Sequence, residues 1–280
     1  LTRGEFVAVF DADATVTPDL LRRVLPVFDR SQVGAVQVRK AIANAPLNFW
    51  TRSQAAEMAL DSFFQQQRTA IGGIGELRGN GQFMRRTALE RCGGWNEETI
   101  TDDLDLTVRL HLDRWDIEFL PFPAVSEEGV TNARALWHQR NRWAEGGYQR
   151  YLDYWQLIVR NRMGTAKTWD LFGFWVTQYI LPTAALPDCL MSIVLRRMPI
   201  ASPLTLMTVT LSVVGMFVGL RRTRKETTKF DVKRVFATLL ETIQATVYMF
   251  HWLLVGTVTA RISVRPKRLK WVKTVHRGTD

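Results

Sequence analysis

Cysteine and histidine are scarce in this sequence, and their scarcity excludes two common ways of holding a domain together. The chain of 280 residues has two cysteines, Cys92 and Cys189, and four histidines. The cysteines lie far apart in segments of different character, so they predict neither a disulfide framework nor a zinc site. The histidines, at positions 111, 138, 251 and 276, do not have the spacing of metal ligands.

A starting methionine is also absent. The first residue is Leu1, and the segment behind it already has the pattern of a strand that runs into a motif. We therefore expect an N-terminal part of the protein to precede Leu1.

Acidic residues are outnumbered by basic ones. Lys and Arg number 37 against 27 Asp and Glu, which gives a formal net charge of +10 at pH 7. Such a balance is typical of proteins that meet nucleic acid, an anionic membrane or phosphate-bearing substrates. The basic residues crowd into two C-terminal clusters, 221–225 and 265–270, and both clusters border long apolar stretches. This placement favours a membrane surface and predicts no nucleic-acid partner.

Residues 1–165 have the pattern of an α/β domain. Short apolar runs predict buried strands, and the longer segments between them predict helices. The expected strands are 5–10, 33–39 and 117–120, and the expected helices are 18–28, 46–70, 87–92, 102–112 and 132–152. The glycine-rich run 72–81 is expected to form a loop or a loop followed by a strand. Strands that alternate with helices predict an α/β architecture with a largely parallel sheet.

Residues 166–280 differ in character, because three long apolar stretches follow one another. They cover 171–195, 203–220 and 235–260. A helix that crosses a bilayer needs about 20 apolar residues, so we expect a membrane region with two or three hydrophobic helices. The third stretch contains Glu241, Gln244 and His251, and it fits either a span or a helix in the membrane interface. Buried core helices are the weaker alternative, since Arg and Lys flank the stretches.

The orientation of these helices is constrained by the basic clusters. If all three stretches span the membrane, the clusters 221–225 and 265–270 lie on opposite sides, which the positive-inside rule disfavours. An interfacial third stretch removes the conflict. We expect an integral membrane protein with its α/β domain in the cytoplasm.

Two carboxylates, Asp11 and Asp13, come directly after the first expected strand. Alone, an acid–x–acid triplet is more often a solvated turn than a functional site. Its place at the carboxyl end of a strand favours function, because ligands of α/β domains bind there. Carboxylate oxygens suit Mg²⁺ or Mn²⁺, and such a cation neutralises the charge of a nucleotide diphosphate leaving group.

Three further carboxylates crowd the turn 101–105. As a plain helix start, Thr101 is the cap, and Asp102 and Asp103 complement the helix dipole. That interpretation does not explain why three acids share one turn, where they repel one another. A crowded carboxylate has a raised proton affinity, which suits a general base such as sugar transfer with inversion requires.

The motif QRNRW at 139–143 lies on the expected helix 132–152. Gln139 and Arg142 are three residues apart and share one face of that helix. In the functional interpretation Gln139 and Arg142 bind the diphosphate, for which Arg142 has a planar fork of donors, and Trp143 offers an apolar face to a sugar or an acceptor. An amphipathic helix at the membrane surface is the alternative interpretation, and both can hold together.

The short motif Gly79-Asn80-Gly81 is the least specific of the set. Glycine lets the backbone approach a ligand closely, so Gly79 and Asn80 are candidates for donor binding. A plain turn explains the same residues equally well.

Taken in order, these motifs resemble the membrane branch of glycosyltransferase family 2, to which cellulose, chitin and hyaluronan synthases belong. The resemblance covers essentially the whole chain and implies a GT-A-type fold, with catalysis in 1–165. It implies metal binding by Asp13 with Asp11 nearby, and Asp103 as the catalytic base, with Asp102 on the acceptor side.

The same resemblance implies that Gln139, Arg142 and Trp143 lie at the diphosphate and acceptor end of the site. The chain departs from the family where Thr101-Asp102-Asp103 replaces the commoner Thr-Glu-Asp. The family's first strand and its uracil-contacting aspartate are expected to precede Leu1, so part of the donor pocket is expected outside this chain.

Several stretches, among them CGGWNEETITDDLDLT and ALWHQRNRW, look most like the members of this branch that move glucose from UDP-glucose to diacylglycerol. The partners implied are a UDP-sugar donor, a membrane lipid acceptor and the bilayer. A processive polysaccharide synthase is the alternative, which the small number of apolar stretches disfavours because a polymer needs a channel. A non-catalytic membrane scaffold is a further alternative, against which the intact carboxylates argue.

Overall fold

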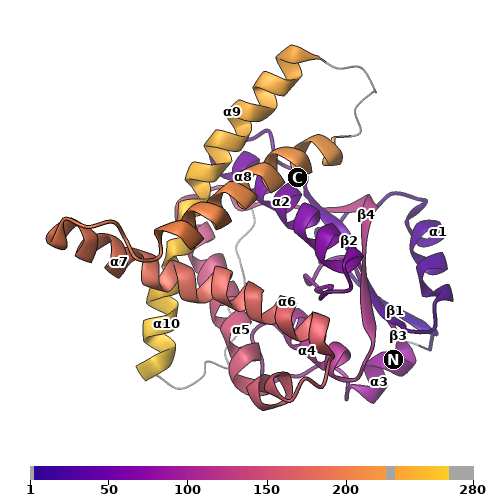
Figure 1. The fold of residues 1–280 in the computed structure, drawn as a ribbon. Helices are drawn as coiled ribbons and strands as arrows, with labels where there is room; N and C mark the ends of the chain where they lie inside the picture. Colours follow the sequence, from indigo (N-terminus) through magenta and orange to yellow (C-terminus); the bar gives the residue numbers. More distant parts are fainter. Residues whose placement is uncertain (1–2, 225–230, 265–280) are drawn as a thin grey trace.

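The computed structural model describes residues 3–224 and 231–264. Within these ranges an α/β layer carries the N-terminal half of the chain, and long helices from the C-terminal half lie beside it (Figure 1). The expected basic cluster 265–270 and Lys225 of the first cluster lie outside the described residues.

The sheet has four strands in the order β1-β3-β2-β4. They are β1 (Phe6–Val9), β2 (Val33–Ile42), β3 (Gln82–Arg85) and β4 (Asp116–Glu127). β2 and β4 are parallel, but β3 is antiparallel to both β1 and β2. The prediction of a largely parallel sheet is therefore wrong, because the chain turns through Gly79 and Gly81, both at positive φ, and enters the sheet between β1 and β2.

Side chains of β2 and β3 alternate between the two faces of the sheet, as the pleat requires. Val36, Val38 and Phe83 pack with α1 (Leu20–Val24) and the 3-10 helix Leu25–Asp29. Ala35 and Met84 pack on the other face with α3 (Arg86–Arg91) and α4 (Asp102–Leu112). The core around the sheet thus has two apolar layers, one on each side of the sheet.

Two strands are longer than expected, and their extensions run toward the site. β2 continues past Arg39 to Ile42, and β4 continues past Leu120 to Glu127. The pairing of β4 with β2 skips from Leu120↔Val38 to Val125↔Lys40. Prolines at 121 and 123 have no N–H to donate, so the ladder is interrupted there and then resumes.

Two long helices of the N-terminal half have well-formed starts. α2 (Phe49–Ala70) begins with a capping box between Asn48 and Thr51. α5 (Ala133–Val159) begins where the side chain of Asn132 accepts a hydrogen bond of 2.9 Å from the backbone N–H of Ala135. These caps satisfy backbone donors that a helix start leaves unpaired, so both helices start at defined residues.

Three helical segments among the described residues are long and apolar enough to cross a membrane: Thr165–Leu195, Ser202–Thr223 and Val232–Val264. The first contains α6 (Thr165–Trp175), a π-helical turn Val176–Ile180 and α7 (Leu181–Leu195); the second is α8; the third contains α9 (Val232–Met249), the 3-10 helix Phe250–Leu254 and α10 (Val255–Val264). They match the three expected apolar stretches, and α7 projects away from the rest (Figure 1).

The helix α2 packs directly on these apolar segments. A Cβ atom on Gly219 of α8 would lie 2.3 Å from the carbonyl oxygen of Ala59, and one on Gly215 would lie 2.9 Å from the ring of Phe63. Only glycine permits such a close approach of two helices. The apolar segments are therefore fitted against the α/β layer through α2.

Candidate active site

Asp103 is a half-buried acid in the first turn of α4. Its Oδ1 accepts a hydrogen bond of 2.8 Å from the backbone N–H of Leu104. Burial, together with the negative charge of Asp102, raises the pKa of Asp103 to about 6, although the Leu104 N–H, Arg78 and Lys40 act in the opposite direction. An acid with this pKa is largely ionised at pH 7 and still able to accept a proton, which is what a general base needs.

The turn that carries Asp103 is held against α5. A Cβ atom on Gly146 of α5 would lie 2.1 Å from Oγ1 of Thr101, so only glycine fits at this crossing. Thr101 is buried at the start of α4, but its side chain makes no capping hydrogen bond. Thr101 therefore occupies the expected N-cap position without a capping hydrogen bond from its side chain, and contact with α5 explains its burial.

Arg142 of α5 faces the carboxylates. Burial lowers the pKa of Arg142, and the negative charges of Asp103, Asp11 and Asp102 oppose that effect. Three acids from two separate segments therefore act on one guanidinium group. The structure thus brings together the end of β1, the Thr-Asp-Asp turn and the QRNRW helix.

A chain of side chains joins the end of β1 to the ends of β2 and β4. Oδ1 of Asn80 accepts a hydrogen bond of 3.3 Å from the backbone N–H of Asp11, and Nδ2 of Asn80 donates to Glu127 over 3.0 Å. Glu127 in turn pairs with Lys40 over 3.0 Å. The buried amide of Asn80 thus fixes the position of Asp11.

Sequence reasoning missed Lys40 and Glu127, because it ended their strands at 39 and 120. The signal that points to Lys40 is the apolar pair Ala41 and Ile42, which continues the strand pattern beyond it. Gly79 lies next to Asp103, since a Cβ atom on this glycine would lie 3.5 Å from Oδ2 of Asp103.

The carboxylates Asp11 and Asp13 are exposed at the end of β1. Oδ2 of Asp13 accepts a hydrogen bond of 3.1 Å from the backbone N–H of Glu128. No group of three His, Cys, Asp or Glu residues within 3–224 and 231–264 is arranged to hold a metal ion. Mg²⁺ is commonly held by one or two carboxylates, with substrate phosphates and waters completing its shell. The pair Asp11 and Asp13 fits that kind of site.

The QRNRW motif divides into residues of different exposure. Arg140 is buried, and its guanidinium carbon lies 4.0 Å from the ring centroid of Trp143. Lys40 Nζ is 5.4 Å from the same centroid. Gln139 Oε1 accepts a hydrogen bond of 2.8 Å from Arg140 Nη1. The side chains of Gln139 and Trp143 are therefore both oriented by Arg140, which sequence reasoning did not single out.

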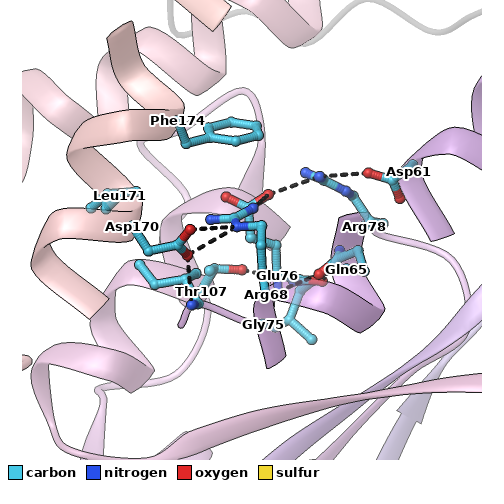
Figure 2. A network of polar contacts seen from close by, with 12 residues as sticks. Asp61, Gln65, Arg68, Gly75, Glu76, Arg78, Thr107, Asp170, Leu171 and Phe174 are labelled. Atoms are coloured by element: carbon cyan, nitrogen blue, oxygen red, sulfur yellow. Dashed lines mark hydrogen bonds and ion pairs between the residues drawn. The ribbon is translucent and has the colours of Figure 1, made fainter. Parts of the chain in front are cut away.

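A second group of charged side chains surrounds Glu76 (Figure 2). Glu76 is fully buried, and its carboxylate lies 2.7 Å from Arg150, 2.8 Å from Arg78 and 3.4 Å from Arg68. Burial alone would raise the pKa of Glu76, but the charges of the three arginines outweigh it and hold the pKa well below its usual range.

Two further acids complete this cluster. Arg78 pairs with Asp61 over 2.8 Å, and Arg68 pairs with Asp170 of α6 over 2.9 Å. Asp170 also accepts a hydrogen bond of 2.8 Å from the backbone N–H of Ile74. Figure 2 shows the chain from Asp170 through Arg68 and Glu76 to Arg78. It ties the first apolar segment to the loop that carries Gly79 and Asn80.

The chain is similar to known proteins along most of its length. The family model described as Glycosyl transferase family group 2 matches residues 6–260. A beta-monoglucosyldiacylglycerol synthase of Trichormus variabilis is 69% identical over 280 residues, which are 100% of this chain and 60% of that protein. A protein of the same name from Synechocystis is 60% identical over 276 residues, which are 98% of this chain and 58% of that protein. The chain therefore spans about 60% of the length of these curated relatives.

One solved structure shows a weaker likeness. It is a mannosyltransferase of Pyrobaculum calidifontis in complex with GDP-Man and Mn²⁺, with a TM-score of 0.49 and 19% identity over 90% of this chain and 63% of that one. A likeness at this level carries neither a donor nor a metal to this chain.

Proposed function

The chain belongs to glycosyl transferase family group 2, and we propose that it forms the catalytic part of an inverting glucosyltransferase that moves glucose from UDP-glucose to diacylglycerol. The observation that carries the proposal is the position of Asp103, an acid with a raised pKa, beside Arg142 and the carboxylates at the end of β1. The printed name of the relatives supports diacylglycerol as the acceptor.

In this proposal Asp103 is the general base. It removes the proton from the acceptor hydroxyl, and the resulting oxygen attacks the anomeric carbon of the sugar. The bond between that carbon and the diphosphate oxygen breaks on the opposite side, so the configuration inverts and UDP leaves. The proton stays on Asp103 until it passes to water.

The leaving group lies at the other end of the site. Arg142 binds the diphosphate oxygens through its planar fork of donors. Asp11 and Asp13 hold a divalent cation, Mg²⁺ or Mn²⁺, which supplies further neutralisation of the diphosphate charge when it is bound. Gly79 allows the backbone to approach the donor, and Asn80 keeps Asp11 in place through the hydrogen bond of 3.3 Å.

The acceptor end of the site is assigned to Trp143, with Asp102 and Gln139 nearby. The indole ring of Trp143 is in contact with two cations, Arg140 and Lys40, which hold it in place. Catalysis is assigned to residues 1–165, which lie on the cytoplasmic side, and membrane attachment is assigned to 166–280. The three apolar segments support that attachment.

Product analysis tests this function. Membranes that contain the full-length protein are incubated with labelled UDP-glucose and diacylglycerol, and the lipid products are separated by chromatography. We expect a single glucosyl-diacylglycerol, its loss after treatment with a chelator, and recovery on addition of Mg²⁺ or Mn²⁺. A product with many sugars would favour a polysaccharide synthase, and no transfer of any labelled sugar would favour a scaffold; either result contradicts the proposal.

A further inference from the structure

Glu57, in the middle of α2, receives hydrogen bonds from two other parts of the fold. It is buried, and its carboxylate accepts hydrogen bonds from Arg140 of α5, from the hydroxyl of Tyr248 over 3.0 Å and from the indole N–H of Trp252 over 2.8 Å. Tyr248 and Trp252 belong to the third apolar segment. A single carboxylate therefore joins α2, the QRNRW helix and that segment.

Burial alone would raise the pKa of Glu57, but the charge of Arg140 and the donors around the carboxylate outweigh it and lower the pKa. Glu57 is consequently ionised, and Arg140 is its buried counter-ion. Nε of Arg140 also donates to His251 Nε2 over 3.3 Å, and one Nη donates to Tyr248 over 3.3 Å. The guanidinium group is fixed from several sides, which leaves it little rotational freedom.

Arg140 transmits this fixed position to the motif. Its Nη1 donates to Gln139, and its guanidinium plane lies against Trp143. Cation–π contacts and charge-assisted hydrogen bonds are directional, so the orientation of Arg140 determines the orientation of both neighbours. A side chain 83 residues away in sequence, Glu57, thus sets the geometry of the motif.

We propose that Glu57 is a positioning residue, which acts through Arg140 to hold Trp143 and Gln139 in the arrangement that receives the acceptor. The inference rests on the proposed function, because it assigns Trp143 to the acceptor end. It makes the third apolar segment part of the acceptor site, since Tyr248 and Trp252 hold the other side of the same carboxylate.

The chain offers a matched control at Glu145. This residue is also a buried glutamate, lies on α5 itself, and pairs with Arg261 of α10 over 2.6 Å. Glu145 and Glu57 both fasten α5 to the third apolar segment. Both Glu145→Gln and Glu57→Gln weaken the contact between α5 and the third apolar segment. Only Glu57→Gln is expected to disturb the position of Trp143 as well.

The first measurement is steady-state kinetics of the full-length protein in vesicles, with the mole fraction of diacylglycerol and the concentration of UDP-glucose varied separately. For Glu57→Gln we expect KM for diacylglycerol to rise about tenfold, with KM for UDP-glucose changed less than about twofold. Glu57→Asp keeps the charge and should recover part of the loss. Equal losses in Glu57→Gln and Glu145→Gln, with no change in KM for diacylglycerol, would overturn the inference.

A second measurement does not depend on the reaction. The tryptophans are replaced by 5-fluorotryptophan, and the ¹⁹F signal of Trp143 is assigned through Trp143→Phe. We expect this signal to shift or broaden in Glu57→Gln and to stay unchanged in Glu145→Gln; an unchanged signal in Glu57→Gln would refute the positioning role. If the wild-type protein makes no glucosyl-diacylglycerol, the proposed function fails, and the ¹⁹F signal still decides whether Glu57 positions Trp143.

Discussion

The buried Glu76 and the half-buried Asp103 have pKa values that are shifted in opposite directions, although one arginine, Arg78, acts on both. Glu76 is surrounded by Arg68, Arg78 and Arg150, and its pKa is held well below the usual range. Asp103 is also withdrawn from water, but a carboxylate is its neighbour, and burial with that charge raises its pKa to about 6. Arg78 pairs with Glu76 and also lowers the pKa of Asp103.

The charged neighbours of an acid, more than its burial, therefore determine the direction in which its pKa is shifted. In the cluster around Glu76, three acids meet three arginines, so the charges balance and the group binds elements together. At Asp103 burial and the charge of another acid, Asp102, outweigh the opposing effects of Arg78 and Lys40, so the charge of this carboxylate is not balanced by its neighbours. A balanced cluster suits structure, and an unbalanced one suits proton transfer.

The largest expected effect removes the proton-accepting group. Asp103→Asn keeps the shape of the side chain but cannot act as a base, so we expect kcat to fall by about 100-fold to 10,000-fold. Binding of UDP-glucose, measured by calorimetry, should be little changed. Asp113→Asn, at the other end of α4, is the control and should retain activity, since Asp113 forms an ion pair with Arg91. Full activity in Asp103→Asn would refute the assignment of the base.

The next effect breaks the balanced cluster. Glu76→Gln removes the shared counter-ion of the buried Arg68 and Arg150 and the half-buried Arg78, so the free energy of unfolding should fall by about 3–5 kcal/mol. Denaturant titration of the solubilised protein measures this change. Glu90→Gln removes an exposed acid that lies 3.8 Å from Arg86, and it should change the free energy by less than about 1 kcal/mol. An equal loss of free energy of unfolding in both variants would mean that the cluster around Glu76 stabilises the fold no more than an exposed ion pair does.

A smaller effect concerns pH. Because the pKa of Asp103 is raised to about 6, this acid is protonated below that pH and cannot accept a proton. We expect kcat/KM to decrease about tenfold for each pH unit below about 6. Titration of Glu76 does not contribute to this decrease in kcat/KM, since the pKa of Glu76 is lowered. A profile that stays flat down to pH 5 would speak against Asp103 as the base.

The smallest expected effect is a shift, along the pH axis, of the decrease in kcat/KM on the acidic side of the profile. Asp102→Asn removes a negative charge that raises the pKa of Asp103, so the acidic limb should move to lower pH. Lys40→Met removes a positive charge that lowers the same pKa, so it should move the limb to higher pH. The shifts are measured from the pH profiles of kcat/KM of the two variants, with Asp113→Asn as the control. Movement in the same direction in both variants would contradict the electrostatic account.

The fold was predictable where apolar runs are uninterrupted. The cores of β1, β2 and β4 lie where the sequence places strands, and α4 has the predicted bounds of 102–112. β3 was missed because four residues of mixed polarity follow a glycine-rich loop and give no period-two signal. The far ends of β2 and β4 were missed because Arg39 and Pro121 look like strand ends, whereas pairing between the two strands carries both past these residues.

Candidate site residues could be identified from the sequence where one short segment contains both the residue and the neighbours that determine its chemistry. Crowding of acids at 101–105 is visible in the sequence, and so is the carboxylate pair at 11–13. The sequence pointed to Arg142 but not to Arg140, because the role of Arg140 depends on a partner that is far away in the sequence. Arg140 turns to Glu57, and Arg142 turns to the carboxylates.

The ion pair between Arg68 and Asp170 also has a consequence for the order in which the protein is built. The two residues are 102 positions apart, so at about 5–20 residues per second a ribosome makes Asp170 roughly 5–20 seconds after Arg68. The ion pair between Glu76 and Arg150 also forms late, because Arg150 is synthesised 74 positions after Glu76. The loop that carries Gly79 and Asn80 therefore gains its last support only once α6 has been synthesised, and the nascent enzyme stays incomplete until its first apolar segment exists.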